Sequence, residues 1–163
     1  MADIVLRDAQ AGDIALLVRL LKEAYVFYGD SNTPSATELD TRLRRYLGAA
    51  PGFEAVIAET GAGEALGVAV FAPVFWTSDC EIALFLKELF ILDRARRKGI
   101  GRKLMARLAK TAVQRGWTRV VWTVDDHNDP AQQFYRQLPG VRPLSKTVYM
   151  QAGRSLERFA REA

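Results

Sequence analysis

The chain has 163 residues, of which 49% are hydrophobic and 26% charged, and its net charge is +4. This length predicts one domain, residues 1–163, with a sizeable core. One cysteine excludes a disulfide framework, and a single histidine argues against a metal site built on several Cys and His ligands. No apolar run is long enough for a membrane span and no signal-peptide pattern opens the chain, so we expect a cytoplasmic protein with no metal ion and no membrane partner.

Charge is divided unevenly along the chain. Residues 1–93 hold 7 Lys or Arg and 14 Asp or Glu, whereas residues 94–163 hold 16 and 5. The balances are therefore −7 and +11. Such a division indicates two different partners rather than one polyanion: a phosphate-bearing ligand for the basic half and a cationic amine for the acidic half.

The first half of the chain predicts two helices and a group of strands. Apolar residues recur at helical spacing between Asp13 and Gly29. Residues 53–59 alternate as a strand does, a hairpin turn follows at residues 60–63, and residues 65–74 return, so these strands are predicted to pair as an antiparallel meander. The elements expected here are a strand at 4–7, a helix between Asp13 and Gly29, a helix at 35–48, strands at 53–59 and 65–74, a turn at 75–79 and a long strand at 80–92.

A glycine-containing turn follows the long strand, with Gly99 and Gly101 one residue apart at the start of a helix. The first N–H groups of a helix have no partner within the helix, and glycines let a phosphate approach them closely. Six cations surround this helix start, where the helix dipole disfavours positive charge; they are Arg94, Arg96, Arg97, Lys98, Arg102 and Lys103. The turn therefore predicts an anion site, and a solvated basic face is the alternative.

The remaining elements follow from the same kind of pattern. The helix after the glycine turn ends at Arg115-Gly116. Residues 119–124 read as a buried strand, which would pair in parallel with residues 86–92 in a right-handed βαβ unit. Asp129 fits a helix N-cap and Pro130 the first helical position. The other expectations are a buried helical stripe at Leu104, Met105, Leu108, Ala109, Ala112 and Val113, a short helix at 131–137, a last strand at 146–151 and a terminal helical turn at 155–160.

Two motifs carry a family resemblance. The turn lacks the GxxxxGK of a P-loop, and Leu104 stands where a dinucleotide-binding GxGxxG needs its third glycine. Arg96-x-x-Gly99-x-Gly101 instead resembles the acetyl-CoA pyrophosphate loop of GNAT N-acetyltransferases, and Asn128-x-x-Ala131-x-x-Phe134-Tyr135 matches a second pattern of that superfamily. The resemblance covers about residues 86–137. It implies an α/β (α+β) fold with a mixed, mostly antiparallel twisted sheet, a splayed parallel strand pair and flanking helices.

The resemblance also implies acetyl-CoA as co-substrate and a direct attack by an amine on its thioester. The pantetheine arm would pair with one parted strand, the pyrophosphate would bind backbone N–H groups of the glycine turn, and the Leu89 N–H would polarise the carbonyl. Tyr135 would protonate the departing thiolate, and Glu88 would take the proton of the amine. The cofactor-binding residues implied are Leu89, Ile91, Arg96, Arg97, Lys98, Gly99, Ile100, Gly101, Arg102, Asn128 and Phe134.

Two further stretches are similar to the diamine (spermidine/spermine) N-acetyltransferase branch of the superfamily. They are Lys87 to Ile91 and a C-terminal set made of Tyr149, Met150, Gly153, Leu156 and Ala160. That branch has an acidic pair where this chain has Lys87-Glu88, and simple strand alternation puts these two residues on opposite faces. The acceptor implied is a small-molecule amine, polyamine- or amino-acid-like. The alternative acceptor is a protein N-terminus or a lysine side chain. The alternative class of protein is a basic nucleic-acid-binding module. The assembly considered is a homodimer.

Each proposed role has a structural alternative. Tyr135 could be a core aromatic, Asn128 a turn residue and Glu88 an exposed strand charge. A further set of side chains could form an aromatic and acidic amine pocket or have separate core and surface roles: Tyr25, Tyr28, Asp30, Trp76 and Asp79.

Overall fold

The computed structural model describes residues 3–162, and its contacts divide the chain into two compact units, one ending at Asp125 and one beginning at Asp126. No helix among these described residues has the length and apolar character of a membrane span. The first unit contains β1 (Ile4–Asp8), α1 (Ile14–Tyr28), α2 (Ala36–Tyr46), β2 (Glu54–Thr60), β3 (Ala65–Trp76), β4 (Glu81–Ile91), α3 (Ile100–Gln114) and β5 (Arg119–Trp122). The second contains α4 (Asp129–Arg136) and α5 (Gly153–Phe159).

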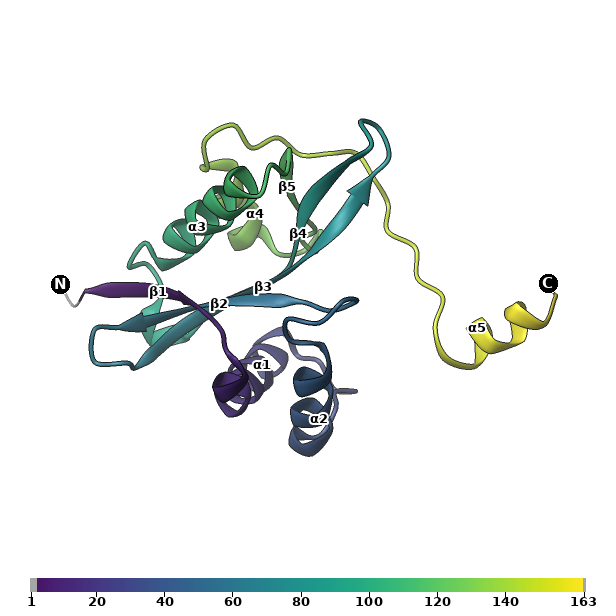
Figure 1. Ribbon diagram of the computed structural model, residues 1–163, viewed down its shortest axis with the longest axis horizontal. Helices are drawn as coiled ribbons and strands as arrows, with labels where there is room; N and C mark the ends of the chain where they lie inside the picture. The colour runs from purple at the N-terminus through teal and green to yellow at the C-terminus, as the bar shows by residue number, and fades with distance from the viewer. Residues whose placement is uncertain (1–2, 163) are drawn as a thin grey trace. The chain divides into compact units, whose positions relative to one another are not determined.

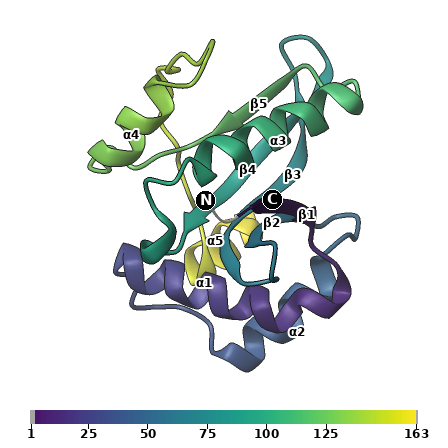
Figure 2. The same ribbon diagram turned by 90° about the vertical axis from the view of Figure 1, so that its left-hand side faces the viewer.

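A five-stranded sheet in the order β1-β2-β3-β4-β5 forms the middle of the first unit. The first three pairings are antiparallel and β4–β5 is parallel. Figures 1 and 2 show α1 and α2 on one face of the sheet and α3 on the other. Because both faces are covered, residues 55–58 of β2 are buried without alternation. The mixed sheet with one parallel pair confirms the predicted fold class.

Helix α1 buries one stripe against the sheet and ends at a left-handed residue. Ile14, Leu17 and Leu21 are buried at the spacing of one helix face. Gly29 has φ = +74°, and its N–H reaches the carbonyl oxygens of Tyr25 and Val26. Glycine adopts this conformation without the steric cost that a side chain would bring. The last turn of α1 is thereby held in a defined position, and it carries two of the aromatic residues discussed below.

Helix α3 makes the predicted crossover between β4 and β5, but its buried face differs in part from the prediction. Leu104 and Leu108 are fully buried together with Ile100, Met105, Thr111 and Ala112. Ala109 and Val113 are exposed, and for them the prediction is wrong. The stripe begins at Ile100, so residues 109 and 113 lie about 100° around the helix from Leu108 and Ala112.

Two predicted strands are shorter or absent. β5 ends at Trp122 rather than at residue 124, and its residues are half-buried because it is the last strand of the sheet. The strand expected at residues 146–151 does not form, and Tyr149 is 90% exposed. A strand needs a neighbour for its backbone groups, and the described part of the second unit contains no strand that could serve. The terminal helix, by contrast, is present as α5.

Truncating α3 on its buried face should cost far more stability than truncating its exposed face. Leu104→Ala removes a fully buried side chain and should lower the free energy of unfolding by about 2–5 kcal/mol. Val113→Ala, on the same helix at 78% exposure, should change it by less than about 0.5 kcal/mol. Urea unfolding of both variants measures the difference, and equal losses would contradict the observed orientation of α3.

Candidate active site

The candidate site is built on a segment of β4 that has a strand on one side only. β4 pairs with β3 along its whole length, but its parallel pairing with β5 stops at Leu86 and Trp122. Residues 87–91, here called the open segment of β4, therefore have no neighbouring strand on the β5 side within the described first unit. Backbone N–H and C=O groups that face this side need another partner. An extended ligand could supply one.

A β-bulge lies at the start of the open segment. Val70 of β3 pairs with Glu88, and the next residue, Phe71, pairs with Leu86, so Lys87 is an extra residue in β4. Bulges bend a strand and redirect its side chains, and they are common next to active sites. The sequence predicts simple alternation at residues 87 and 88 and does not reveal this feature, because no glycine or proline marks the bulge.

The turn after β4 prepares the N-terminus of α3 for an anion. Leu92 and Ala95 are buried and anchor the turn, whereas Arg97 and Gly99 adopt positive φ angles of 60° and 75°. Positive φ angles in such a turn can direct backbone N–H groups toward one point. Among residues 3–162, no side chain caps α3, and its first turn contains no acidic residue. The N–H groups of this helix start therefore suit a phosphate.

The six predicted cations divide into two groups. Arg94 pairs with Glu64 at 2.8 Å, Arg96 pairs with Asp93 at 3.1 Å, and Lys98 donates to the Arg94 carbonyl oxygen. Within the described chain, the other three cations (Arg97, Arg102 and Lys103) make no ion pair. These three side chains remain to attract a polyanion, and they flank the uncapped helix start.

Arg96 connects the glycine turn with α1. Its Nε donates to the Ile91 carbonyl oxygen at 3.2 Å, and its guanidinium carbon lies 3.9 Å from the centre of the Phe27 ring. The Phe27 ring also lies 6.2 Å from that of Phe90 on β4. The last turn of α1 is therefore packed against both the open segment and the turn that follows it.

Glu88 lies half-buried on the open segment. Its Oε1 accepts a hydrogen bond from the Tyr28 hydroxyl at 3.1 Å. Burial raises the pKa of Glu88 above the ordinary value, while Tyr28, the Lys87 charge and the Leu89 N–H act to lower it. A carboxylate with a raised pKa is a better proton acceptor at neutral pH than an ordinary one.

A hollow of about 480 Å³ lies at the C-terminal end of α1, lined by Tyr25 and residues 29–34. Burial, and after it the charges of Glu88 and Asp30, raise the pKa of Tyr25, so these groups lie close together. Of the aromatic and acidic set considered from the sequence, the structure thus brings together Tyr25, Tyr28 and Asp30 around Glu88.

Trp76 and Asp79 lie elsewhere. Trp76 is six residues along β3 from Val70, the partner of Glu88, which corresponds to about 20 Å. There Arg119 contacts the Trp76 ring and bonds to Asp79. These two residues therefore have a structural role at the β3–β4 turn.

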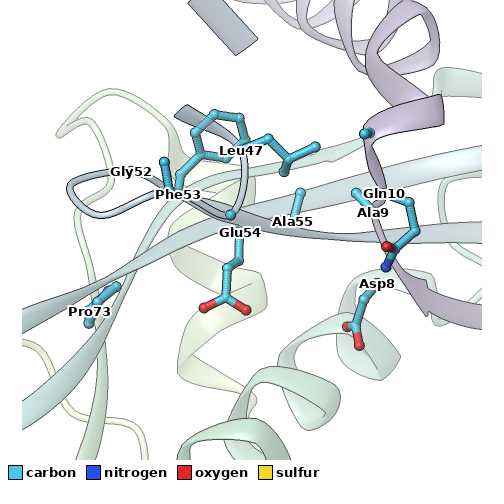
Figure 3. Close-up of a pocket in the computed structure, with 12 residues that line it drawn as sticks. Asp8, Ala9, Gln10, Leu47, Gly52, Phe53, Glu54, Ala55 and Pro73 are labelled. Carbon is cyan, nitrogen blue, oxygen red and sulfur yellow. The ribbon is translucent and has the colours of Figure 1, made fainter. Parts of the chain in front are cut away.

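A second cavity, of about 460 Å³, is lined by residues of β1, β2 and β3 and of the segments next to them (Figure 3). Asp8, Glu54 and Pro73 are among its lining residues, and Pro73 pairs with Leu84, ahead of the open segment. Its two carboxylates are ion-paired, Asp8 with Arg107 at 2.8 Å and Glu54 with Arg115 at 2.5 Å. The cavity contains none of the predicted site residues.

The second unit contains the other predicted residues. The Asn128 side-chain oxygen accepts from the Ala131 N–H at 3.1 Å, so Asn128 is the N-cap of α4. The prediction that Asp129 is the N-cap is wrong, because the asparagine one residue earlier takes that position. The rings of Phe134 and Tyr135 lie 5.1 Å apart, and both side chains are half-buried.

The chain was then compared with known proteins. Residues 16–138 match the model of the acetyltransferase (GNAT) family. Thialysine N-epsilon-acetyltransferase of Sus scrofa is 26% identical over 155 residues, which are 90% of this chain and 88% of that protein. D-amino-acid N-acetyltransferase HPA3 of Saccharomyces cerevisiae is 31% identical over 95 residues, 58% of each chain. An integron cassette protein from V. cholerae superposes with a TM-score of 0.82 at 24% identity, covering 98% of both chains.

These matches define the class of the protein. The chain belongs to the GNAT family of acetyltransferases, and it is therefore an acyltransferase enzyme. The two motifs recognised in the sequence, Arg96-x-x-Gly99-x-Gly101 and Asn128 to Tyr135, both lie inside the matched residues.

Proposed function

We propose that the protein transfers the acetyl group of acetyl-CoA to the primary amine of a small molecule. The observation that carries the proposal is the continuity of the open segment of β4 with the uncapped start of α3. An extended thioester chain needs backbone partners, and the diphosphate behind it needs N–H groups and cations. The first unit offers both along one stretch of chain, residues 87–103.

Acetyl-CoA supplies an activated acyl group, and the residues of this chain bind it. Leu89 and Ile91 present their backbone to the pantetheine arm. The backbone from Arg97 to Arg102, which includes Lys98, Gly99, Ile100 and Gly101, binds the pyrophosphate, with Arg96 beside it. Phe134 and Asn128 contribute from α4 and its cap, as the family pattern implies. The fit rests on the positive φ angles of the turn and on Arg97, Arg102 and Lys103, which make no ion pair within the described chain.

The transfer itself needs two proton movements. A C–N bond forms as the amine attacks the thioester carbonyl, and the C–S bond breaks. Glu88 accepts the proton that the amine loses, and Tyr135 donates a proton to the departing thiolate. With reference pKa values of about 10 for a phenol and about 8.5 for a thiol, both groups are protonated at neutral pH, so Tyr135 holds a proton to donate and then recovers one from solvent as the free thiol leaves. The Leu89 N–H stabilises the charge that develops on the carbonyl oxygen.

The acceptor is a small amine that is cationic before it reacts. The hollow at the end of α1 is lined by Asp30 and Tyr25, a carboxylate and an aromatic ring that suit a cation, and Tyr25 lies within electrostatic range of Glu88. The names of the two relatives, an acetyltransferase for thialysine and one for D-amino acids, support the same class. We further propose that the enzyme acts in the cytoplasm, as one domain per chain and as a homodimer.

Cofactor binding and acceptor choice are tested in one experiment. Coenzyme A at about 100 times its Kd should raise the unfolding temperature by about 5–10 °C, whereas duplex DNA should leave it unchanged. Release of free thiol from acetyl-CoA is then measured with a panel of polyamines, amino acids and peptides. Stabilisation by DNA alone would contradict the proposal, and thiol release only with peptides would move the acceptor to proteins.

Tyr135→Phe should lower turnover far more than cofactor affinity, because it removes only the hydroxyl that protonates the thiolate. We expect kcat to fall by about 100-fold or more while the Kd for acetyl-CoA changes by less than about three-fold. Steady-state kinetics and calorimetry measure the two quantities. An unchanged kcat would remove Tyr135 from the mechanism.

A further inference from the structure

We propose that Tyr28 is a positioning residue for the reaction, because its hydroxyl holds and orients the Glu88 carboxylate at the open segment of β4. The inference rests on the proposed function, in which Glu88 accepts the proton of the amine. It adds a residue from the N-terminal part of the chain to a site that the sequence motifs place entirely after residue 86.

The contact joins two elements that are far apart in sequence. The Tyr28 Oη lies 3.1 Å from Glu88 Oε1, across 60 residues of chain. Phe27, the preceding residue, packs against Arg96 and Phe90 on the same side of the sheet. The last turn of α1 therefore contacts the open segment through two adjacent aromatic side chains.

The backbone fixes where the Tyr28 side chain begins. The left-handed Gly29 ends α1 directly after Tyr28, and the Asp30 N–H bonds to the Tyr25 carbonyl oxygen at 2.9 Å. Upstream, the buried stripe of α1 holds the helix against the sheet. On β4, the bulge at Lys87 sets the position of Glu88, since it shifts the register of the strand immediately before that residue. The hydrogen bond therefore joins two side chains whose backbone positions are fixed, Tyr28 by the end of α1 and Glu88 by the bulge in β4.

Several groups face Glu88 and act on its ionisation in opposite directions. Burial raises the pKa of Glu88, and the negative charge of Asp30 from the turn after α1 adds to this effect. The Tyr28 hydroxyl, Lys87 and the Leu89 N–H favour the carboxylate and lower the pKa. Tyr25 also lies within electrostatic range of Glu88, and Arg42 of α2 acts on Tyr25. Among these groups, Tyr28 is the one whose contact with Glu88 is lost when a single atom, the hydroxyl oxygen, is removed.

The consequence is a pH dependence with a definite sign. A hydrogen bond donated to a carboxylate stabilises the charged form, so its loss raises the pKa of Glu88 further. Below that pKa, Glu88 is protonated and cannot accept the proton of the amine. Tyr28→Phe should therefore move the acidic limb of the rate profile to higher pH by about 0.5–1 unit. On that limb the rate should fall about 3–10-fold, and on the alkaline plateau by less than about three-fold.

The first measurement is the titration of Glu88 by carbon-detected NMR on the ligand-free protein with labelled glutamate, in which Glu88→Gln identifies the signal. The matched control is Tyr46→Phe, which removes the same hydroxyl at a similar exposure, 38% for Tyr46 and 40% for Tyr28. Tyr46 lies on α2, where its ring contacts Arg45. Tyr28→Phe should raise the pKa of Glu88, and Tyr46→Phe should leave it unchanged. Equal pKa values in wild type and Tyr28→Phe would overturn the inference.

The second measurement is the pH profile of thiol release from acetyl-CoA with thialysine as acceptor. A shifted acidic limb in Tyr28→Phe, with the limb of Tyr46→Phe unmoved, supports the positioning role. A shift in pKa without a shift of the limb would overturn it, because Glu88 would then not control the rate. If the wild-type protein released no thiol with thialysine or any amine of the panel, the proposed function would fail, and the NMR titration would still report on the Tyr28 contact by itself.

Discussion

The site depends on backbone groups of β4 that no strand of the first unit pairs. β4 and β5 run in parallel only as far as Leu86 and Trp122, and beyond that point β4 continues alone next to β3. An unpaired backbone in the middle of a sheet is costly unless water or a ligand bonds to it. In the proposed function, the extended thioester chain of acetyl-CoA meets this requirement. The bulge at Lys87 lies next to the residue where the pairing of β4 with β5 ends.

Elements on both sides of this open segment supply opposite charges. The glycine turn at its end presents Arg97, Arg102 and Lys103 around the uncapped start of α3. The last turn of α1, with the turn after it, presents Tyr28 and Asp30 beside Glu88. The site therefore has a cationic end suited to a diphosphate and an anionic end suited to an amine, and Arg96 packed on Phe27 joins the two ends.

The uneven charge of the sequence has a second cause besides ligand binding. Several carboxylates of the first 93 residues pair with arginines that come later in the chain: Asp8 with Arg107, Glu54 with Arg115, Glu64 with Arg94 and Asp79 with Arg119. The two halves thus neutralise each other across the sheet and its turns. Exposed ion pairs of this kind contribute about 0–1 kcal/mol each to the free energy of unfolding, so they add little to the stability of the fold. The interpretation that the charge division reflects two ligands, one phosphate-bearing and one cationic, therefore applies only to the charged side chains at the site that these ion pairs do not neutralise.

Local patterns in the sequence predicted the elements of the first unit and the glycine turn well, because periodicity and turn chemistry act over a few residues. The same patterns could not show the bulge at Lys87, since its cause is the pairing with β3, or the contact of Tyr28 with Glu88, since it joins positions 60 residues apart. They also predicted a strand at 146–151, although a strand forms only where a neighbour accepts its hydrogen bonds. Whether Tyr135 and Glu88 act on one substrate stays a prediction of the family pattern.

Hydrogen exchange of the backbone amides tests the central claim most directly. If the open segment of β4 and the glycine turn bind acetyl-CoA, adding the cofactor should slow exchange of amides within residues 87–91 and 97–102 by about ten-fold or more, while amides of β1 exchange as before. If saturating acetyl-CoA left both stretches unchanged, or protected only residues outside them, the account of this site would be wrong.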